Sequence, residues 1–124
     1  NERTWGEILD KNGIDGLEFK NGEPDFTPIA KGSVKIEEFT IDRDDNFFQA
    51  DQNLAQLWSQ ENKNGKNDWS ISDIRKYRKE KKLTWHERSD MKNMDLVAQE
   101  IHGNIPHSGG ISKKKRLELE ENND

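Results

Sequence analysis

The sequence predicts a small domain of the α+β class. Two segments carry apolar residues at helical spacing, and two short segments further along carry the alternating pattern of strands. The helical segments lie before residue 82, and the two strands lie within residues 83–98. Both kinds of element are therefore expected in one small domain, as in the α+β class.

The composition limits the size and type of the core. The 124 residues suit one compact domain, with 29% hydrophobic and 36% charged side chains, so four Trp and five Phe must supply much of the buried area. No run approaches the roughly 18 apolar residues that a membrane span needs, so we expect no membrane segment. Cysteine is absent, which excludes disulfides and thiolate metal ligands.

The first half of the chain is predicted to contain loops, one short strand and a helix. Residues 10–33 are rich in Gly, Pro and Asn-Gly pairs, as turns and irregular loops are. Residues 34–37 alternate apolar with polar and predict a short strand. A helix is expected from an N-cap at Asp45 or Asn46 to about residue 61. Its apolar residues fall at helical spacing: Phe47, Ala50, Leu54, Leu57 and Trp58.

The second half is predicted to contain a capped helix, a hairpin and a short helical turn. Ser70 and Asp73 have the spacing of a capping box, which places a helix over 71–81. Residues 83–87 are expected to form a strand and residues 94–98 its hairpin partner. A helical turn should follow over 98–105, before Pro106 and Gly109-Gly110.

Charge is distributed unevenly along the chain. The net charge is -5, but residues 1–60 hold six Lys or Arg against 13 Asp or Glu, whereas residues 66–116 hold 13 against seven. The basic half also holds all three histidines, His86, His102 and His107. Neutral imidazole binds borderline divalent metals and takes up protons near neutral pH, so the cluster indicates metal or acid–base chemistry. The alternative is that these are surface histidines with ordinary packing roles.

Four sequence pieces around these histidines resemble a known family. They are Leu-Thr-Trp-His-Glu at 83–87, Met-Asp-Leu-Val at 94–97, Ile-His at 101–102 and His-Ser-Gly-Gly at 107–110. In this order they closely resemble the HNH/endonuclease VII superfamily of toxin nucleases, in the Trp-His-His or Trp-His-Glu subgroup found in bacterial polymorphic toxins. A softer resemblance extends over roughly residues 22–113. The chain departs from the family pattern at Ala98, where Pro is common, and at Glu87, where His is common.

The resemblance implies a ββα-metal (His-Me finger) nuclease core that follows an N-terminal loop-rich and helical accessory region. In this fold a hairpin and a helix hold one divalent ion, here Mg, Mn, Zn or Ni, against the scissile phosphate. His86 is the preferred general base, with Glu87 as the alternative base or a metal ligand. His102 and His107 are expected to be metal ligands, and Asn93 or Asn104 could supply the Asn of the HNH name.

Further residues are expected to bind nucleic acid or to support the site. A basic stretch precedes the motif and would hold a phosphate backbone, unless it is only a solvated helix face. Its members are Arg75, Lys76, Arg78, Lys79, Lys81 and Lys82. Trp85 should alternate with His86 on the strand and pack in the core. Gly109 and Gly110 should permit a tight turn, and the basic run at 113–116 is a second phosphate contact or aids solubility.

The functional expectation is a nuclease toxin directed at competing bacteria. The whole chain would be one nuclease domain, with residues 1–66 as accessory loops and helix, 67–112 as basic helix and ββα-metal motif, and 113–124 as a polar tail. DNA is the favoured substrate, with RNA cleavage on the same scaffold or a non-enzymatic, metal-stabilised binding module as alternatives. The domain is expected to be the C-terminal part of a larger secreted or contact-delivered toxin, to act in the target-cell cytoplasm, and to require a cognate immunity protein in the producer.

Overall fold

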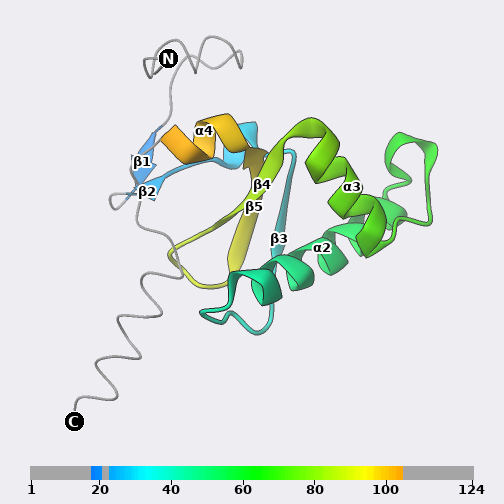
Figure 1. The fold of residues 1–124 in the computed structure, drawn as a ribbon, viewed down its shortest axis with the longest axis horizontal. Helices are drawn as coiled ribbons and strands as arrows, with labels where there is room; N and C mark the ends of the chain where they lie inside the picture. The colour runs from blue at the N-terminus through cyan, green and yellow to red at the C-terminus, as the bar shows by residue number, and fades with distance from the viewer. Residues whose placement is uncertain (1–17, 21–22, 105–124) are drawn as a thin grey trace.

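A three-stranded antiparallel sheet lies at the centre of the molecule. The computed structural model describes residues 18–20 and 23–104. The sheet has the strand order β3-β5-β4, formed by Gly32–Lys35, Asn93–Ala98 and Leu83–Glu87 (Figure 1). A separate two-stranded pair, β1 (Phe19–Lys20) and β2 (Glu23–Pro24), lies to the left of it in Figure 1 and leads into the 3₁₀ turn η1 (Thr27–Ile29). Helices and this small antiparallel sheet confirm the predicted α+β class.

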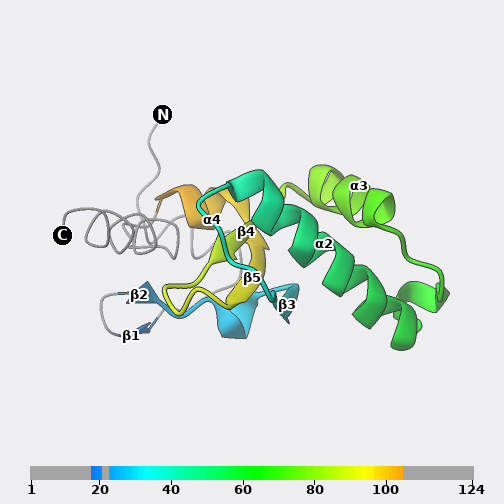
Figure 2. The same cartoon turned by 90° about the horizontal axis from the view of Figure 1, so that it is seen from below.

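Two long helices cover one face of the sheet. Helix α2 spans Arg43–Gln60 and helix α3 spans Ile71–Lys81, with the 3₁₀ turn η2 (Lys63–Gly65) between them. Figure 2 shows α2 and α3 side by side, extending together beyond the sheet. The main core joins Leu54 and Trp58 of α2 and Ile74 of α3 to Trp85 and Leu96 of the sheet. Trp58 also packs against the rings of Trp69 and Tyr77 at 5.0 Å, so aromatic residues supply much of this core.

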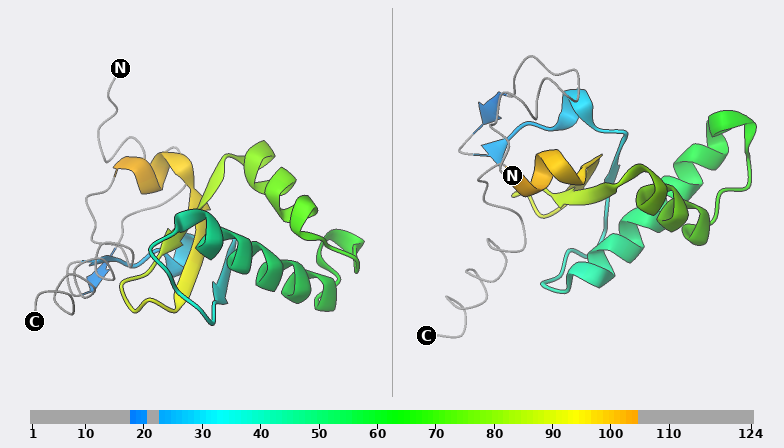
Figure 3. Two further views of the ribbon diagram at one scale, coloured as in Figure 1. Left: turned by 60° about the horizontal axis from the view of Figure 1, so that its bottom comes forward. Right: turned by 45° about the horizontal axis from the view of Figure 1, so that its top comes forward.

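Helix α4 (Gln99–Asn104) lies against the opposite face. It follows β5 directly, and Ile101 of α4 packs with Val97 of β5 and Phe26 in a second, smaller core. Ile29 of η1 also packs against this core, and the right-hand view of Figure 3 shows α4 beside η1. The hairpin β4–β5 and α4 together form a ββα unit.

The helix caps explain where the helices begin. Ser70 accepts from the backbone of Asp73, and the Asp73 side chain accepts from the backbone of Ser70, so the predicted capping box and the predicted helix over 71–81 are confirmed. The predicted start of the first helix was wrong by three residues or more, because Asp42 rather than Asp45 or Asn46 is the N-cap. Several Asp and Asn residues in a row can each cap a helix, and the earliest one does so here.

The strands agree with prediction to within a few residues. The hairpin was predicted at 83–87 and 94–98, and its register pairs Leu83 with Ala98 and Glu87 with Met94. The strand predicted at 34–37 lies two residues earlier, at Gly32–Lys35. Gly32 lies close to α2, because a Cβ there would lie 2.9 Å from Leu54 Cδ1 and the Leu54 side chain would have to shift. Within the described ranges, none of the helices has the length and hydrophobicity needed to cross a bilayer.

Candidate active site

Strand β4 sorts its side chains to the two faces of the sheet. Successive residues of a strand point to opposite sides, so Trp85 and Glu87 face α2 while His86 faces α4. Trp85 is buried in the main core, where its Nε1 donates to Asp51 Oδ1 at 2.8 Å. This contact joins β4 to α2 on one face of the sheet, and His86 lies on the opposite face.

His86 and His102 lie next to each other on that face. Their ring centroids are 5.3 Å apart at an interplanar angle of 61°, with His86 from β4 and His102 from α4. Phe26 packs edge-on against His86 at 4.8 Å and lies 6.1 Å from His102. His86 is only 1% exposed, whereas His102 is half-buried. The fold therefore brings together two histidines that are 16 positions apart in the sequence.

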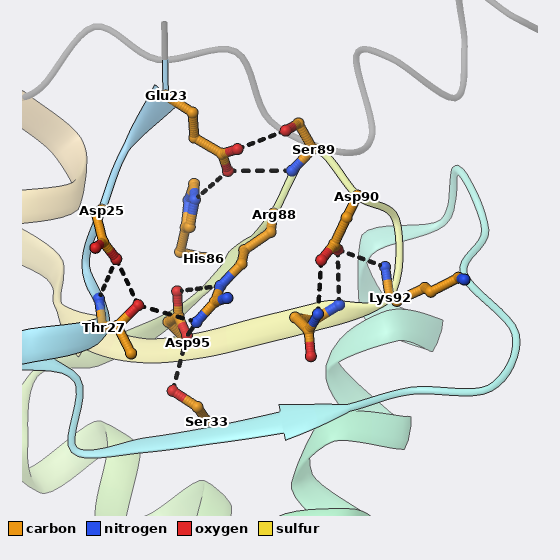
Figure 4. Close-up of polar contacts among 11 residues, drawn as sticks. Glu23, Asp25, Thr27, Ser33, His86, Arg88, Ser89, Asp90, Lys92 and Asp95 are labelled. Atoms are coloured by element: carbon orange, nitrogen blue, oxygen red, sulfur yellow. Dashed lines mark hydrogen bonds and ion pairs between the residues drawn. The ribbon is translucent and has the colours of Figure 1, made fainter. Parts of the chain in front are cut away.

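Glu23 is part of this site, although nothing in the sequence analysis singled it out. Its Oε1 lies 2.9 Å from His86 Nε2 and accepts from the Ser89 backbone N–H at 3.1 Å. The Ser89 hydroxyl donates to the other carboxylate oxygen (Figure 4). Glu23 precedes His86 by 63 positions, and no local spacing links the two, so sequence inspection of a single chain gave no signal for it.

A cleft of about 230 Å³ is lined by residues 23–27, 88–90 and Asp95. Two of these residues, Glu23 and Phe26, contact His86. Arg88 bridges its floor, with Nε and Nη2 donating to both oxygens of the buried Asp95 at 2.7 and 2.6 Å. Ser33 also donates to Asp95, and Arg88 reaches Thr27 (Figure 4). The hydrogen bond to Asp95 raises the pKa of the Arg88 guanidinium, so this cation remains charged at any working pH.

Glu87 lies on the other face of the sheet from the two histidines with which it was expected to share a metal or a catalytic role. Its carboxylate is turned toward α2, where Arg43 Nε donates to Oε1 at 3.1 Å and Asn46 Nδ2 donates to Oε2 at 2.8 Å. The physical reason is the strand alternation that also turns Trp85 to that side. Glu87 therefore fastens the end of β4 to the first turns of α2.

Most of the chain matches a known protein family. A model of the DNase/tRNase domain of colicin-like bacteriocins matches residues 16–109, well over half of the chain. The chain belongs to this family. It is a nuclease toxin domain, and its substrate is nucleic acid. Among curated proteins, no sequence gives a significant match.

The predicted basic stretch of the bacteriocin nuclease domain divides into two groups. Arg78 is committed to the core, because its Nε and Nη2 donate to the fully buried Asp51 at 2.9 and 2.7 Å. These two bonds tie Arg78 to the core, and the phosphate contact expected of it stays a prediction. The other members are exposed: Arg75, Lys76, Lys79, Lys81 and Lys82. Helix α3 covers the sheet face opposite to His86, and only its end approaches α4, where Gln99 N–H donates to the Lys82 carbonyl at 2.9 Å.

Some predicted residues of the bacteriocin nuclease domain lie outside the described residues. These are His107, Gly109, Gly110 and the basic run at 113–116. Over residues 18–20 and 23–104, no group of three His, Asp or Glu side chains is arranged to hold one metal ion. Asn93 donates from Nδ2 to Asp90 at 2.6 Å and so belongs to the β4–β5 turn.

Burial of Glu87 gives the bacteriocin nuclease domain a predicted pH dependence. Burial raises the pKa of Glu87 above its ordinary value of 4.5, and the Asn46 hydrogen bond and the Arg43 charge offset only part of this. The folded protein therefore binds this proton more tightly than the unfolded chain does. As the pH falls through the folded-state pKa toward 4.5, we expect the unfolding free energy of the wild type to rise relative to Glu87→Gln. Urea titrations of both proteins at several pH values would measure this difference, and a difference that falls with falling pH would contradict it.

Proposed function

We propose that this domain is a metal-dependent HNH-type endonuclease that cleaves DNA in competing bacteria. The observation that carries the proposal is the contact between His86 of β4 and His102 of α4 within the ββα unit, with ring centroids 5.3 Å apart. One group able to take a proton and one group able to bind a metal thus meet on a domain that belongs to a nuclease family, and Glu23 and Phe26, which contact His86, line a neighbouring cleft.

His86 is assigned as the general base. A buried imidazole held on a strand by a neighbouring ring and a carboxylate has a fixed orientation, which general base catalysis requires. The base takes a proton from water, the water oxygen bonds to phosphorus, and the bond from phosphorus to the 3′ oxygen breaks. The departing 3′ oxygen takes a proton from solvent, and His86 gives its proton to solvent.

His102 and His107 would hold one divalent ion, either Mg, Mn, Zn or Ni. Imidazole suits such an ion, and the contact between the rings of His102 and His86 at 5.3 Å supports His102 as one of its ligands. When bound, the ion supplies positive charge that stabilises the phosphate and the departing oxygen. Glu87 is left out of this ligand set, because its carboxylate is bound to Arg43 and Asn46.

The exposed lysines of α3 are assigned to the phosphate backbone of the substrate. Replacing Lys79 and Lys81 with glutamine is expected to weaken binding to all DNA sequences alike, and to reduce the slope of log affinity against log salt by about one for each lost contact. Fluorescence anisotropy at several salt concentrations would measure the slope. Lys66→Gln is the matched control, because this lysine already neutralises Asp68 and Asp73 at 3.0 and 3.5 Å. An unchanged slope in the double variant would show that these lysines of α3 do not contact the phosphate backbone.

A plasmid-nicking assay tests the proposed activity. The 124-residue chain is incubated with supercoiled plasmid and each of the four metals, with and without chelator. Nicking that chelator abolishes and metal restores supports a metal-dependent nuclease. Absence of cleavage on every nucleic acid, together with tight metal binding, would instead support a non-enzymatic binding module.

RNA cleavage is the second candidate function, because the matching family is described as containing both DNase and tRNase domains. Parallel reactions on plasmid, tRNA and ribosomal RNA decide between them. Under either outcome we propose that the domain acts in the cytoplasm of a target cell, after secretion or contact delivery as the C-terminal part of a larger toxin. A cognate immunity protein would then protect the producer.

A further inference from the structure

Two arginines on the α2 side of the sheet are each held by a buried carboxylate. Arg43 Nε donates to Glu87 Oε1 at 3.1 Å, and Arg75 Nε lies 3.9 Å from Asp51 Oδ2. The two carboxylates are 6% and 0% exposed, whereas the two arginine side chains are 65% and 59% exposed. Each arginine therefore combines a buried contact at Nε with a guanidinium that is accessible from outside.

These arginines belong to two helix faces that meet where α2 and α3 lie side by side (Figure 2). On α2, Arg43, Phe47 and Asp51 follow at intervals of four residues. On α3, Arg75 and Arg78 are three residues apart, so each set lies on one side of its helix. Arg78 joins the two sets, because its Cζ lies 5.4 Å from the centre of the Phe47 ring and its Nε and Nη2 donate to Asp51. We call Arg43, Arg78 and Arg75 the arginine row.

The arginine row follows the outer strand of the sheet. Strand β4 is an edge strand in the order β3-β5-β4. Its Glu87 binds Arg43, and its Trp85 donates to Asp51. Arg43 and Asp51 are eight residues apart on α2, which is about 12 Å along the helix axis. One strand of a duplex rises about 3.4 Å per nucleotide, so this length corresponds to roughly three or four nucleotides.

Three aspartates lie close to Arg43 in the sequence. Asp42 is the N-cap of α2 and accepts from the backbone N–H groups of Asp44 and Asp45. At about 100° per residue, Asp45 lies on the far side of the helix from Arg43, and Asp44 lies on its flank. Within the part of the chain that the structure describes, the ion pair of Arg43 is made with Glu87. The exposed end of Arg43 can therefore meet an anion from outside.

We propose that Arg43 and Arg75 bind two phosphates of one strand of the nucleic-acid substrate. This inference rests on the proposed function and extends its interface from the α3 lysines to the first turn of α2. A guanidinium presents its donors in one plane and binds phosphate oxygens by two parallel hydrogen bonds. Anchoring at Nε orders the side chain before the substrate arrives, so less conformational entropy is lost on binding. Because β4 is the outer strand, a substrate that follows its edge can also reach the face of His86.

Salt titrations of DNA binding test the proposal without cleavage. Fluorescence anisotropy with a DNA duplex is measured in the presence of chelator. Arg43→Gln and Arg75→Gln are each expected to reduce the slope of log affinity against log salt by about 0.9, and the double variant by about 1.8. Duplexes of different sequence should lose affinity alike, since phosphate contacts carry no sequence information. Lys66→Gln is the matched control, because this lysine is already paired with Asp68 and Asp73.

A conservative variant separates position from charge. Arg43→Lys keeps the positive charge, but lysine has a single nitrogen and cannot bind Glu87 and present a pair of donors to a phosphate at once. We expect a wild-type slope with an affinity that is lower by about 2- to 10-fold at each salt concentration, the loss of one hydrogen bond. Thermal unfolding verifies that each variant is folded.

Two results would overturn the proposal. One is a wild-type slope in folded Arg43→Gln or Arg75→Gln, and the other is wild-type affinity in Arg43→Lys. If these slopes fall while the plasmid assay shows no cleavage, the proposed function fails and the arginine row remains a nucleic-acid contact. If plasmid is nicked and the slopes do not change, the proposed function stands and this inference fails.

Discussion

Replacing His86 with alanine is expected to lower metal-dependent cleavage by about 10³-fold, the middle of the range for loss of a positioned general base. The ring is held between Phe26, His102 and Glu23, and alanine offers no nitrogen that could take up a proton at this position of β4. Metal binding through α4 should persist, since His102 is untouched. Single-turnover cleavage of plasmid at saturating metal would measure the loss.

The controls for this variant follow from its burial. His86 is 1% exposed, so alanine at this position leaves a cavity. The larger His86→Asn variant is therefore measured as well. Thermal unfolding verifies that both variants are folded. Thr84→Ala is the matched control, because Thr84 lies two residues earlier on β4 and faces the same side of the sheet. If the folded His86→Ala protein cleaves at the wild-type rate, His86 is not the general base.

Asp51→Ala is expected to cost about 3–5 kcal/mol of unfolding free energy, the usual loss when one partner of a buried ion pair is removed. The Asp51 carboxylate is fully buried and accepts from Trp85 Nε1 at 2.8 Å and from two nitrogens of Arg78 at 2.9 and 2.7 Å. Its removal leaves the indole N–H and the guanidinium without their acceptor. Such a loss is a large fraction of the roughly 5–15 kcal/mol that stabilises a typical domain.

Urea unfolding followed by tryptophan fluorescence would measure the effect. Gln52→Ala is the matched control, because it is the next residue on α2 and is exposed, and its cost should stay within about 0.5 kcal/mol. Asp51→Asn should lie between the two, since it keeps one acceptor for Trp85. A loss below about 1 kcal/mol for Asp51→Ala would show that the buried pair does not stabilise the fold as argued.

Local sequence signals were sufficient for most of the fold. The capping box of Ser70 and Asp73 gave the start of α3, and alternation gave both strands of the hairpin, because these signals depend on residues a few positions apart. The start of α2 was misjudged because several capping residues follow one another there. The two-residue strands β1 and β2 carry too few side chains to show any period.

The candidate site was only partly predictable for a related reason. The alternation of side chains along a strand predicts that Trp85 and His86 lie on opposite faces of the sheet. The same rule puts Glu87 on the face of Trp85, away from His86. By contrast, the partners Glu23 for His86 and Asp51 for Arg78 come from distant segments that meet only in the folded chain. Neighbouring positions in the sequence therefore suggested a shared site for His86 and Glu87, whose side chains lie on opposite faces. The sequence gave no indication that Glu23 contacts His86.

The two faces of β4 have a practical consequence for work on this toxin. The sheet separates two groups of packed residues. One group joins β4 to α2, and the other surrounds His86 on the opposite face. Under the proposed function, a substitution confined to the histidine face is therefore expected to yield an inactive protein in which the contacts between the sheet and α2 are kept. Such a protein could be produced without harm to its host and crystallised with uncut nucleic acid, which would reveal the substrate in its bound form.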